Sequence, residues 1–157
     1  MIDSRTKGKN AELEAALEMQ ILLGIPWMRT AQACGKWTGD IVPKDKDIGI
    51  HVEVKHYRTG ITWWQRRARR SFLNIGGELY YALLSELPRI LEQQDLPESS
   101  PRCATAEGWF AQAKRDAGDK IPIVLCRQNK GPWLIVWHSS QDDELCEILR
   151  EVKGASV

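Results

Sequence analysis

The chain has 157 residues, enough for one domain with a hydrophobic core, and it shows neither an apolar signal segment near its start nor an apolar run long enough to cross a bilayer. Its net charge of +1 hides an asymmetry, because residues 1–70 hold 13 basic against 8 acidic side chains, whereas residues 71–157 hold 9 against 13. The basic half is compatible with a polyanionic partner, and the scattered cysteines argue against a zinc site and for reduced thiols in the cytoplasm: Cys34, Cys103, Cys126 and Cys146.

Residues 10–23 have the period of an amphipathic helix, which a basic, glycine-containing lead at 5–9 precedes. A helical projection gathers its apolar residues on one side: Leu13, Ala16, Leu17, Met19 and Leu23. Glu12 falls on this apolar side, in the first turn, so its carboxylate is aimed at the core or its edge; the preference of acids for helix N-termini would place it there equally well. Gly24 and the following proline end the helix.

Residues 25–29 and 37–42 are short strand candidates, and residues 50–55 alternate apolar and polar side chains like a half-buried strand. Gly39 allows a close approach of the backbone just before Asp40. A charged turn at 43–47 joins the two later strands into an antiparallel hairpin, so Asp40 and Glu53 are expected to lie a few ångströms apart. Two carboxylates at that distance repel unless a proton or a cation lies between them, and a hard divalent ion suits such oxygen ligands.

Residues 60–96 have apolar side chains at three- and four-residue spacing, which predicts a mostly helical segment. Four arginines directly follow Trp63 and Trp64: Arg66, Arg67, Arg69 and Arg70. Arginines bind phosphates and tryptophans stack on bases, so this run indicates nucleic-acid contact, with a solvated helix face over core tryptophans as the alternative. Residues 96–104, which contain prolines and serines, are expected to form a loop.

The last third of the chain reads as helix, two strands and helix. Residues 109–117 predict a helix that ends at Gly118. Residues 121–126 and 133–137 are nearly all apolar, as buried strands are, and residues 142–152 form an amphipathic helix with three apolar side chains inward: Leu145, Ile148 and Leu149.

This order of features resembles the PD-(D/E)xK nuclease superfamily. Within it, the chain looks most like Holliday junction resolvases of the archaeal and phage type, in four short motifs: Lys7-Gly8-Lys9-Asn10-Ala11-Glu12, Gly39-Asp40, Glu53-Val54-Lys55 and Gln112-Ala113-Lys114-Arg115-Asp116. The resemblance covers residues 5–57 and about 107–137. The chain departs from the pattern in having glycine rather than proline before the aspartate, and in an insertion at about 60–106 that the compact resolvases lack.

The resemblance implies an α/β fold with a restriction-endonuclease-like central mixed β-sheet flanked by helices, and a helical insertion at about 60–106, in a single nuclease domain over residues 1–157. It implies that Asp40, Glu53 and the backbone carbonyl of Val54 hold Mg²⁺, with Mn²⁺ able to substitute, and that Glu12 binds through a water or a second ion. Lys55 would orient or deprotonate the attacking water, and Gln112 would be a supporting contact. Asp47 competes with Asp40 as the first acid, although its lysine-rich turn indicates a solvent-facing position.

The substrate that the resemblance implies is branched DNA, above all a four-way junction, cut by a homodimer because two strands need two active sites. The basic residues expected to contact DNA are Arg5, Lys7, Lys9, Arg58, Arg66, Arg67, Arg69 and Arg70. A small stand-alone nuclease of this kind fits a phage or mobile element. Two alternatives stay open, a restriction-like, repair or replication nuclease of the same superfamily and a non-catalytic DNA-binding protein, but a binding module has no use for three acids facing a polyanion. His51 shares the face of Glu53 and is expected to be a neighbour rather than a ligand.

Overall fold

In a computed structural model of the chain, the structure describes residues 4–30, 39–57, 73–75, 79–93, 98–100, 104–128 and 131–155. The elements, with η for 3₁₀ turns, are α1 (Ser4–Leu23), β1 (Trp27–Arg29), β2 (Ile41–Pro43), β3 (Ile50–Tyr57), β4 (Leu73–Ile75), β5 (Leu79–Leu83), η2 (Leu84–Glu86), α3 (Leu87–Gln93), β6 (Glu98–Ser100), α4 (Ala104–Ala117), β7 (Ile121–Gln128), β8 (Leu134–His138), η3 (Ser139–Gln141) and α5 (Asp142–Ala155). None of the helices in these ranges is long and apolar enough to cross a membrane.

The described strands form one mixed sheet in the order β1-β2-β3-β7-β8-β5-β4-β6. β3 and β7 run parallel over their whole length, from Ile50 opposite Ile121 to Tyr57 opposite Gln128. The β4–β6 pair is also parallel, and the other neighbours are antiparallel. The predicted α/β fold with a mixed sheet is therefore confirmed, while its restriction-endonuclease-like arrangement stays a prediction.

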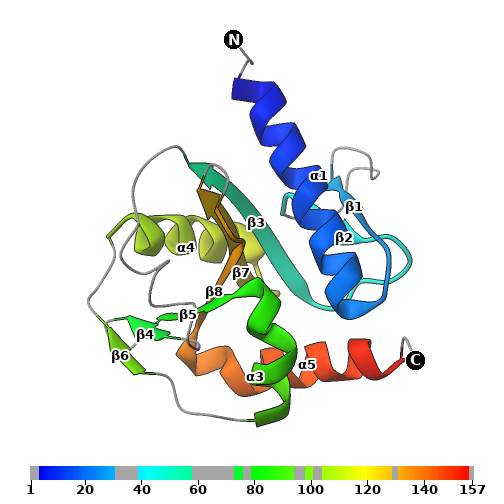
Figure 1. Cartoon of the computed structure of the whole chain (residues 1–157), viewed down its shortest axis with the longest axis vertical. Coiled ribbons are helices and arrows are strands. Elements are labelled where there is room, and N and C mark those ends of the chain that lie inside the picture. The colour runs from blue at the N-terminus through cyan, green and yellow to red at the C-terminus, as the bar shows by residue number, and fades with distance from the viewer. Residues whose placement is uncertain are drawn as a thin grey trace.

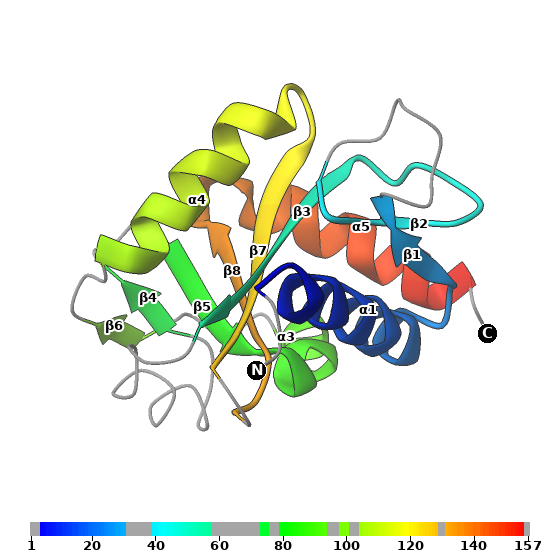
Figure 2. The same ribbon diagram turned by 90° about the horizontal axis from the view of Figure 1, so that it is seen from above.

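Helices cover both faces of this sheet (Figures 1 and 2). One face packs on α1, η2, α3 and α5, whose buried residues include Met19, Leu84 and Leu149. The other face packs on α4 through Ala106, Phe110 and Ala113. β7 and β8 lie in the middle of the sheet and are buried on both faces, which explains why their sequences are almost continuously apolar, as predicted.

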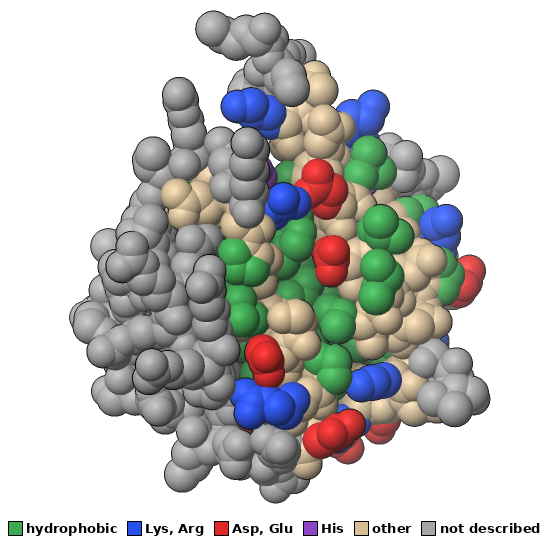
Figure 3. All heavy atoms as spheres, viewed as in Figure 1, with side chains coloured by type: hydrophobic (Ala, Val, Ile, Leu, Met, Phe, Trp, Pro, Cys, Tyr) green, Lys and Arg blue, Asp and Glu red, His purple; other side chains and the backbone are tan. Residues whose placement is uncertain are grey.

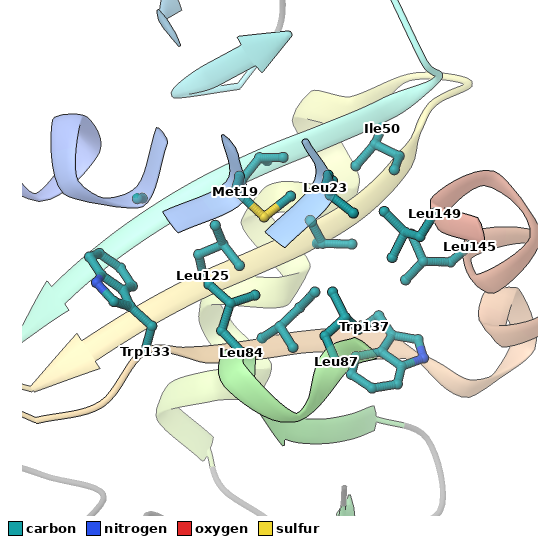
Figure 4. Close-up of a cluster of buried hydrophobic side chains, with 14 of the residues drawn as sticks. Met19, Leu23, Ile50, Leu84, Leu87, Leu125, Trp133, Trp137, Leu145 and Leu149 are labelled. Carbon is teal, nitrogen blue, oxygen red and sulfur yellow. The ribbon is translucent and has the colours of Figure 1, made fainter. Parts of the chain in front are cut away.

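The larger core cluster joins segments that are far apart in the chain. Figure 4 shows Leu23 of α1 between Met19 of the same helix and Leu149 of α5, with Leu145 and Trp137 in the same cluster. Cys126 and Cys146 are buried free thiols, and the other two cysteines lie outside the described residues.

The predicted orientation of α1 is partly wrong. The helix begins at Ser4, so the basic lead is its first turns rather than a preceding loop. Leu13 and Leu17, expected to point inward, are 43% and 56% exposed, and Ile21 is 67% exposed. The core side consists instead of small residues with two larger ones: Ala11, Ala15, Ala16, Met19 and Leu23. Because the helix is apolar on two opposite sides, a projection of the sequence could not tell which side is buried.

The helical prediction for residues 60–96 is wrong for much of what the structure describes there. Residues 73–75 and 79–83 are strands, and only 84–93 are helical. Leu79 and Leu83 were expected on a helix, but a spacing of four also fits a strand period of two, and β5 pairs with β8 from Leu79 opposite His138 to Leu83 opposite Leu134. The insertion therefore extends the sheet, and its remaining residues lie outside the described ranges.

The other element predictions are confirmed with shifted bounds. The first two short strands narrow to β1 and β2, with residues 31–38 outside the described part, and the expected loop at 96–104 contains β6. α4 begins five residues earlier than expected, and it ends as predicted before Gly118, whose φ is +62°. Leu145 and Leu149 of α5 are buried and Ile148 is partly buried.

Candidate active site

Main-chain hydrogen bonds fix the first carboxylate of the site. Asp40 lies directly before β2, and its amide donates to the carbonyl of Val52 at 2.7 Å. Its Oδ2 accepts from the amide of Val54 at 2.7 Å. The side chain of Asp40 therefore takes the place that a longer β2 would occupy beside β3, and its carboxylate is held against the middle of that strand.

The residue before Asp40 has to be glycine. Gly39 has a φ of +90°, and a Cβ at this position would lie 2.7 Å from the carbonyl oxygen and 3.0 Å from the nitrogen of Val52. Backbone atoms cannot yield at such distances, and other residues rarely adopt this φ. The close approach expected of Gly39 is thus confirmed, and it gives a physical reason for glycine where the resolvase motif has proline.

The two carboxyl groups lie next to each other and ionise differently. Burial raises the pKa of Asp40 to about 7 against the lowering effect of the Val54 amide, and the negative charges of Glu53 and Glu12 add to the rise. A hydrogen bond with His51 holds the pKa of Glu53 below its ordinary value in spite of burial, helped by a hydrogen bond with Asp40. Below pH 7 the pair therefore carries a proton on Asp40 and a charge on Glu53. The predicted proximity of the two acids is confirmed.

His51 is a neighbour of the site, as expected from its place on β3. Its Nε2 lies 2.9 Å from Oε1 of Glu53, and only 1% of the residue is exposed. Glu53 itself is 7% exposed.

A lysine and a glutamine complete this side of the site. Lys55 lies two residues beyond Glu53 on the same face of β3, and its Nζ donates to Oε1 of Gln112 at 3.0 Å. Gln112 comes from α4, 57 residues later in the chain. The structure thus places Gln112, which the resemblance implied as a supporting contact, against Lys55. The ammonium group of Lys55 is close enough to Glu53 to lower the pKa of that carboxylate.

Glu12 is near the pair of acids but has a partner of its own. Its charge contributes to the raised pKa of Asp40. Its Oε2 accepts from Nε of Arg29 at 2.7 Å, and the two side chains are 22% and 15% exposed. Arg29 lies opposite Ile41 in the β1–β2 pair, which explains how it comes close to Asp40. Sequence reasoning did not find Arg29, because a basic residue at the end of a three-residue strand carries no signal of its own.

The oxygen atoms of Asp40, Glu53 and the Val54 carbonyl could provide some of the ligands of a hard divalent cation. The Asp40 and Glu53 carboxyl groups are joined by a hydrogen bond, and a cation with oxygen ligands would relieve the same repulsion. The amide and the carbonyl of a strand residue point to the same edge, so the carbonyl of Val54 faces the edge where Asp40 binds its amide. Within the described ranges, no group of three His, Cys, Asp or Glu side chains could hold a metal ion, so such an ion would rely on two carboxylates, this carbonyl and water.

Asp47, the competing first acid, has a different task. Its Oδ1 accepts from the amide of Gly49 at 2.9 Å, and its Oδ2 lies 3.1 Å from Nζ of Lys120. These contacts lower the pKa of Asp47, whose side chain is 46% exposed. Asp47 therefore stabilises the turn before β3, and the geometry favours Asp40 as the partner of Glu53.

Few of the expected DNA contacts can be placed. Lys7 and Lys9 lie exposed on α1. Arg5 lies in the first turn of α1, and the other predicted residues lie outside the described ranges: Arg58, Arg66, Arg67, Arg69 and Arg70.

In comparisons with protein-family models, with curated proteins and with solved structures, no match to this chain was found. The assignment of the site therefore depends on its own geometry and on the motifs of the sequence.

Proposed function

We propose that the chain is a Mg²⁺-dependent endonuclease of the PD-(D/E)xK type that acts on branched DNA as a Holliday junction resolvase. The observation that carries the proposal is the convergence of Asp40, Glu53, Lys55 and Gln112 from separate parts of the chain, with Glu12 close enough to raise the pKa of Asp40. Acids gathered in this way would repel a DNA backbone unless a cation lay between them, so they favour hydrolysis over binding alone.

Each residue has a chemical task in this proposal. Mg²⁺ held by Asp40, Glu53 and the Val54 carbonyl would neutralise the phosphate and favour ionisation of a water. Lys55, held by Gln112 at 3.0 Å, orients the attacking water next to the carboxylates. Arg29 offsets the charge of Glu12, which leaves a net negative charge centred on the Asp40–Glu53 pair.

A second candidate is a nuclease of the same type with another DNA substrate. It is favoured by the insertion at 60–106, whose described strands β5, β4 and β6 extend the sheet on the side away from β1. Such an extension does not alter the site, but it changes the surface available to DNA.

The test compares a labelled four-way junction with linear, nicked and flapped duplexes of the same arms, in Mg²⁺ or EDTA. We expect paired symmetric nicks in the junction alone, and their loss in Asp40→Asn and in EDTA. Cleavage of the other duplexes would keep the site and assign the second candidate function. Binding without cleavage in any condition would refute both proposals in favour of a DNA-binding protein.

We also propose a homodimer in which α1 supplies the contact. Leu13, Leu17 and Ile21 recur every four residues on the exposed side of α1, opposite its core side, and Figure 3 shows hydrophobic side chains gathered along this helix. The stripe is self-complementary: antiparallel pairing about Leu17 sets Leu13 against the partner's Ile21. The same pairing places the basic first turns, with exposed Lys7 and Lys9, beside the C-terminal carbonyls of the partner helix, which is electrostatically favourable.

Sedimentation velocity over a concentration series tests this contact. Leu17→Glu places two like charges at the centre of the pair and should weaken dimerisation at least tenfold. Glu18→Gln changes a polar residue of the same helix that lies about 100° around the helix axis from Leu17, and it serves as the matched control. A wild-type chain that sediments as a monomer throughout, or a Leu17→Glu dimer of wild-type affinity, would rule out α1 as the interface.

A further inference from the structure

The imidazole of His51 is the most buried polar group beside the site. It lies two residues before Glu53, so both side chains point to the same face of β3. Its Nε2 lies 2.9 Å from Oε1 of Glu53, and 1% of the residue is exposed. An ionised carboxylate only accepts hydrogen bonds, so Nε2 carries the proton and donates it to Glu53.

Packing alone does not account for a histidine at this position. Its other ring nitrogen, Nδ1, is buried and has no hydrogen-bond partner among the described residues. A buried polar atom without a partner costs free energy, which an apolar side chain of similar size would avoid. Within the described ranges, the polar contact that His51 gains in return is its hydrogen bond to Glu53.

We propose that His51 is a positioning residue that holds the carboxylate of Glu53 in the orientation required for a divalent cation. This inference rests on the proposed function. Glu53 is held from two sides, by His51 and by a hydrogen bond with Asp40. With a cation between the two acids, the hydrogen bond from His51 would be the contact that fixes the rotamer of Glu53. Partners of this kind around metal ligands change metal affinity roughly 10- to 100-fold.

Three substitutions separate this role from a structural one. In His51→Gln the amide nitrogen is as many bonds from Cα as Nε2 of histidine, so the donor to Glu53 is kept. In His51→Asn the donor is one bond short, and in His51→Leu it is absent. The readout is the dissociation constant for Mn²⁺, measured by titration calorimetry, with thermal unfolding in EDTA as the measure of folding.

We expect Asn and Leu at position 51 to weaken Mn²⁺ binding roughly 10- to 100-fold, and Gln to stay within about threefold of the wild type. Because His51→Leu removes the unpaired Nδ1 but also the donor to the buried Glu53, thermal unfolding in EDTA serves to show that each variant is folded. Equal Mn²⁺ affinity in the wild type and His51→Leu would overturn the positioning role while leaving the metal site intact, as would an equal loss in Gln and Asn. A wild type that binds no Mn²⁺ would instead refute the metal site of the proposed function, and the role of His51 with it.

Discussion

The two faces of β3 are buried to a similar degree, yet burial has opposite energetic consequences on them. Ile50 and Val52 face α1 and the larger core cluster, where removing apolar surface from water stabilises the fold. His51 and Glu53 on the other face are also nearly inaccessible, but there burial opposes ionisation and hydrogen bonds must compensate for it. Alternate residues of β3 therefore stabilise the fold, and the residues between them belong to the proposed active site. Single substitutions should change either the free energy of unfolding or the cleavage activity.

The largest separation is expected for Glu53→Gln. Loss of the carboxylate should lower the single-turnover cleavage rate of the preferred DNA substrate by about 10³-fold or more, because the divalent ion loses one of its two side-chain ligands. The chain should stay folded in EDTA, since glutamine has nearly the size of glutamate and its amide oxygen can still accept the hydrogen bond from His51. Asp45→Asn, in the exposed turn before β3, is the matched control and should leave the cleavage rate unchanged. A cleavage-competent Glu53→Gln chain would contradict the assignment of this face to catalysis.

Gly39→Ala should affect both faces at once. The added Cβ would meet the carbonyl of Val52 at 2.7 Å, at a φ that alanine rarely adopts. We expect a loss of about 3 kcal/mol in the free energy of unfolding by urea, together with weaker Mn²⁺ binding as Asp40 moves. The control is Gly8→Ala in α1, where a Cβ meets nothing within 4 Å and should stabilise the chain by about 0.5–1 kcal/mol. If the two variants were equally stable, the close approach at Gly39 would not be a requirement of the fold.

Val52→Ala tests the apolar face alone. Val52 is fully buried, and removal of two methyl groups should lower the free energy of unfolding by about 2 kcal/mol. The cleavage rate per folded molecule and the Mn²⁺ affinity should change by less than about twofold, because the side chain points away from Glu53. Urea unfolding measures the free energy of unfolding, and titration calorimetry on the same preparation measures the Mn²⁺ affinity. A Val52→Ala chain as stable as the wild type but weaker in Mn²⁺ binding would reverse the assignment of the two faces.

The sequence alone predicted those features of the structure that depend on short-range patterns of residues. The alternation at 50–55 located β3 and the shared direction of Glu53 and Lys55, and the glycine before Asp40 indicated the close approach that the structure contains. Gln112 could be assigned to the site through the resemblance alone, since 57 residues separate it from Lys55.

Other features depend on partners that no local pattern reveals. Leu79 and Leu83 have a spacing that fits either a helix or a strand, and pairing with β8 decided the outcome. Leu13 and Leu17 lie on an apolar side of α1, but which apolar side is buried depends on where β1 and β3 lie. The position of Arg29 depends on the register in which β1 pairs with β2. The sequences of two such short strands do not determine that register.

Asp40 should contribute a pH dependence of stability that is small over any one pH unit. Its pKa is about 7 in the folded chain against 3.8 as the ordinary value, so between these pH values the folded state holds a proton that the unfolded state has lost. In EDTA, the free energy of unfolding should therefore fall as pH rises from about 4 to 7, by at most about 1.4 kcal/mol per pH unit. Asp40→Asn should remove this slope, whereas saturating Mg²⁺ should reverse it, because the cation competes with the proton. A wild-type chain and an Asp40→Asn chain with parallel pH profiles in urea unfolding would show that Asp40 is not buried against Glu53, and the polar face of β3 would then lack the strained pair that distinguishes it from the apolar face.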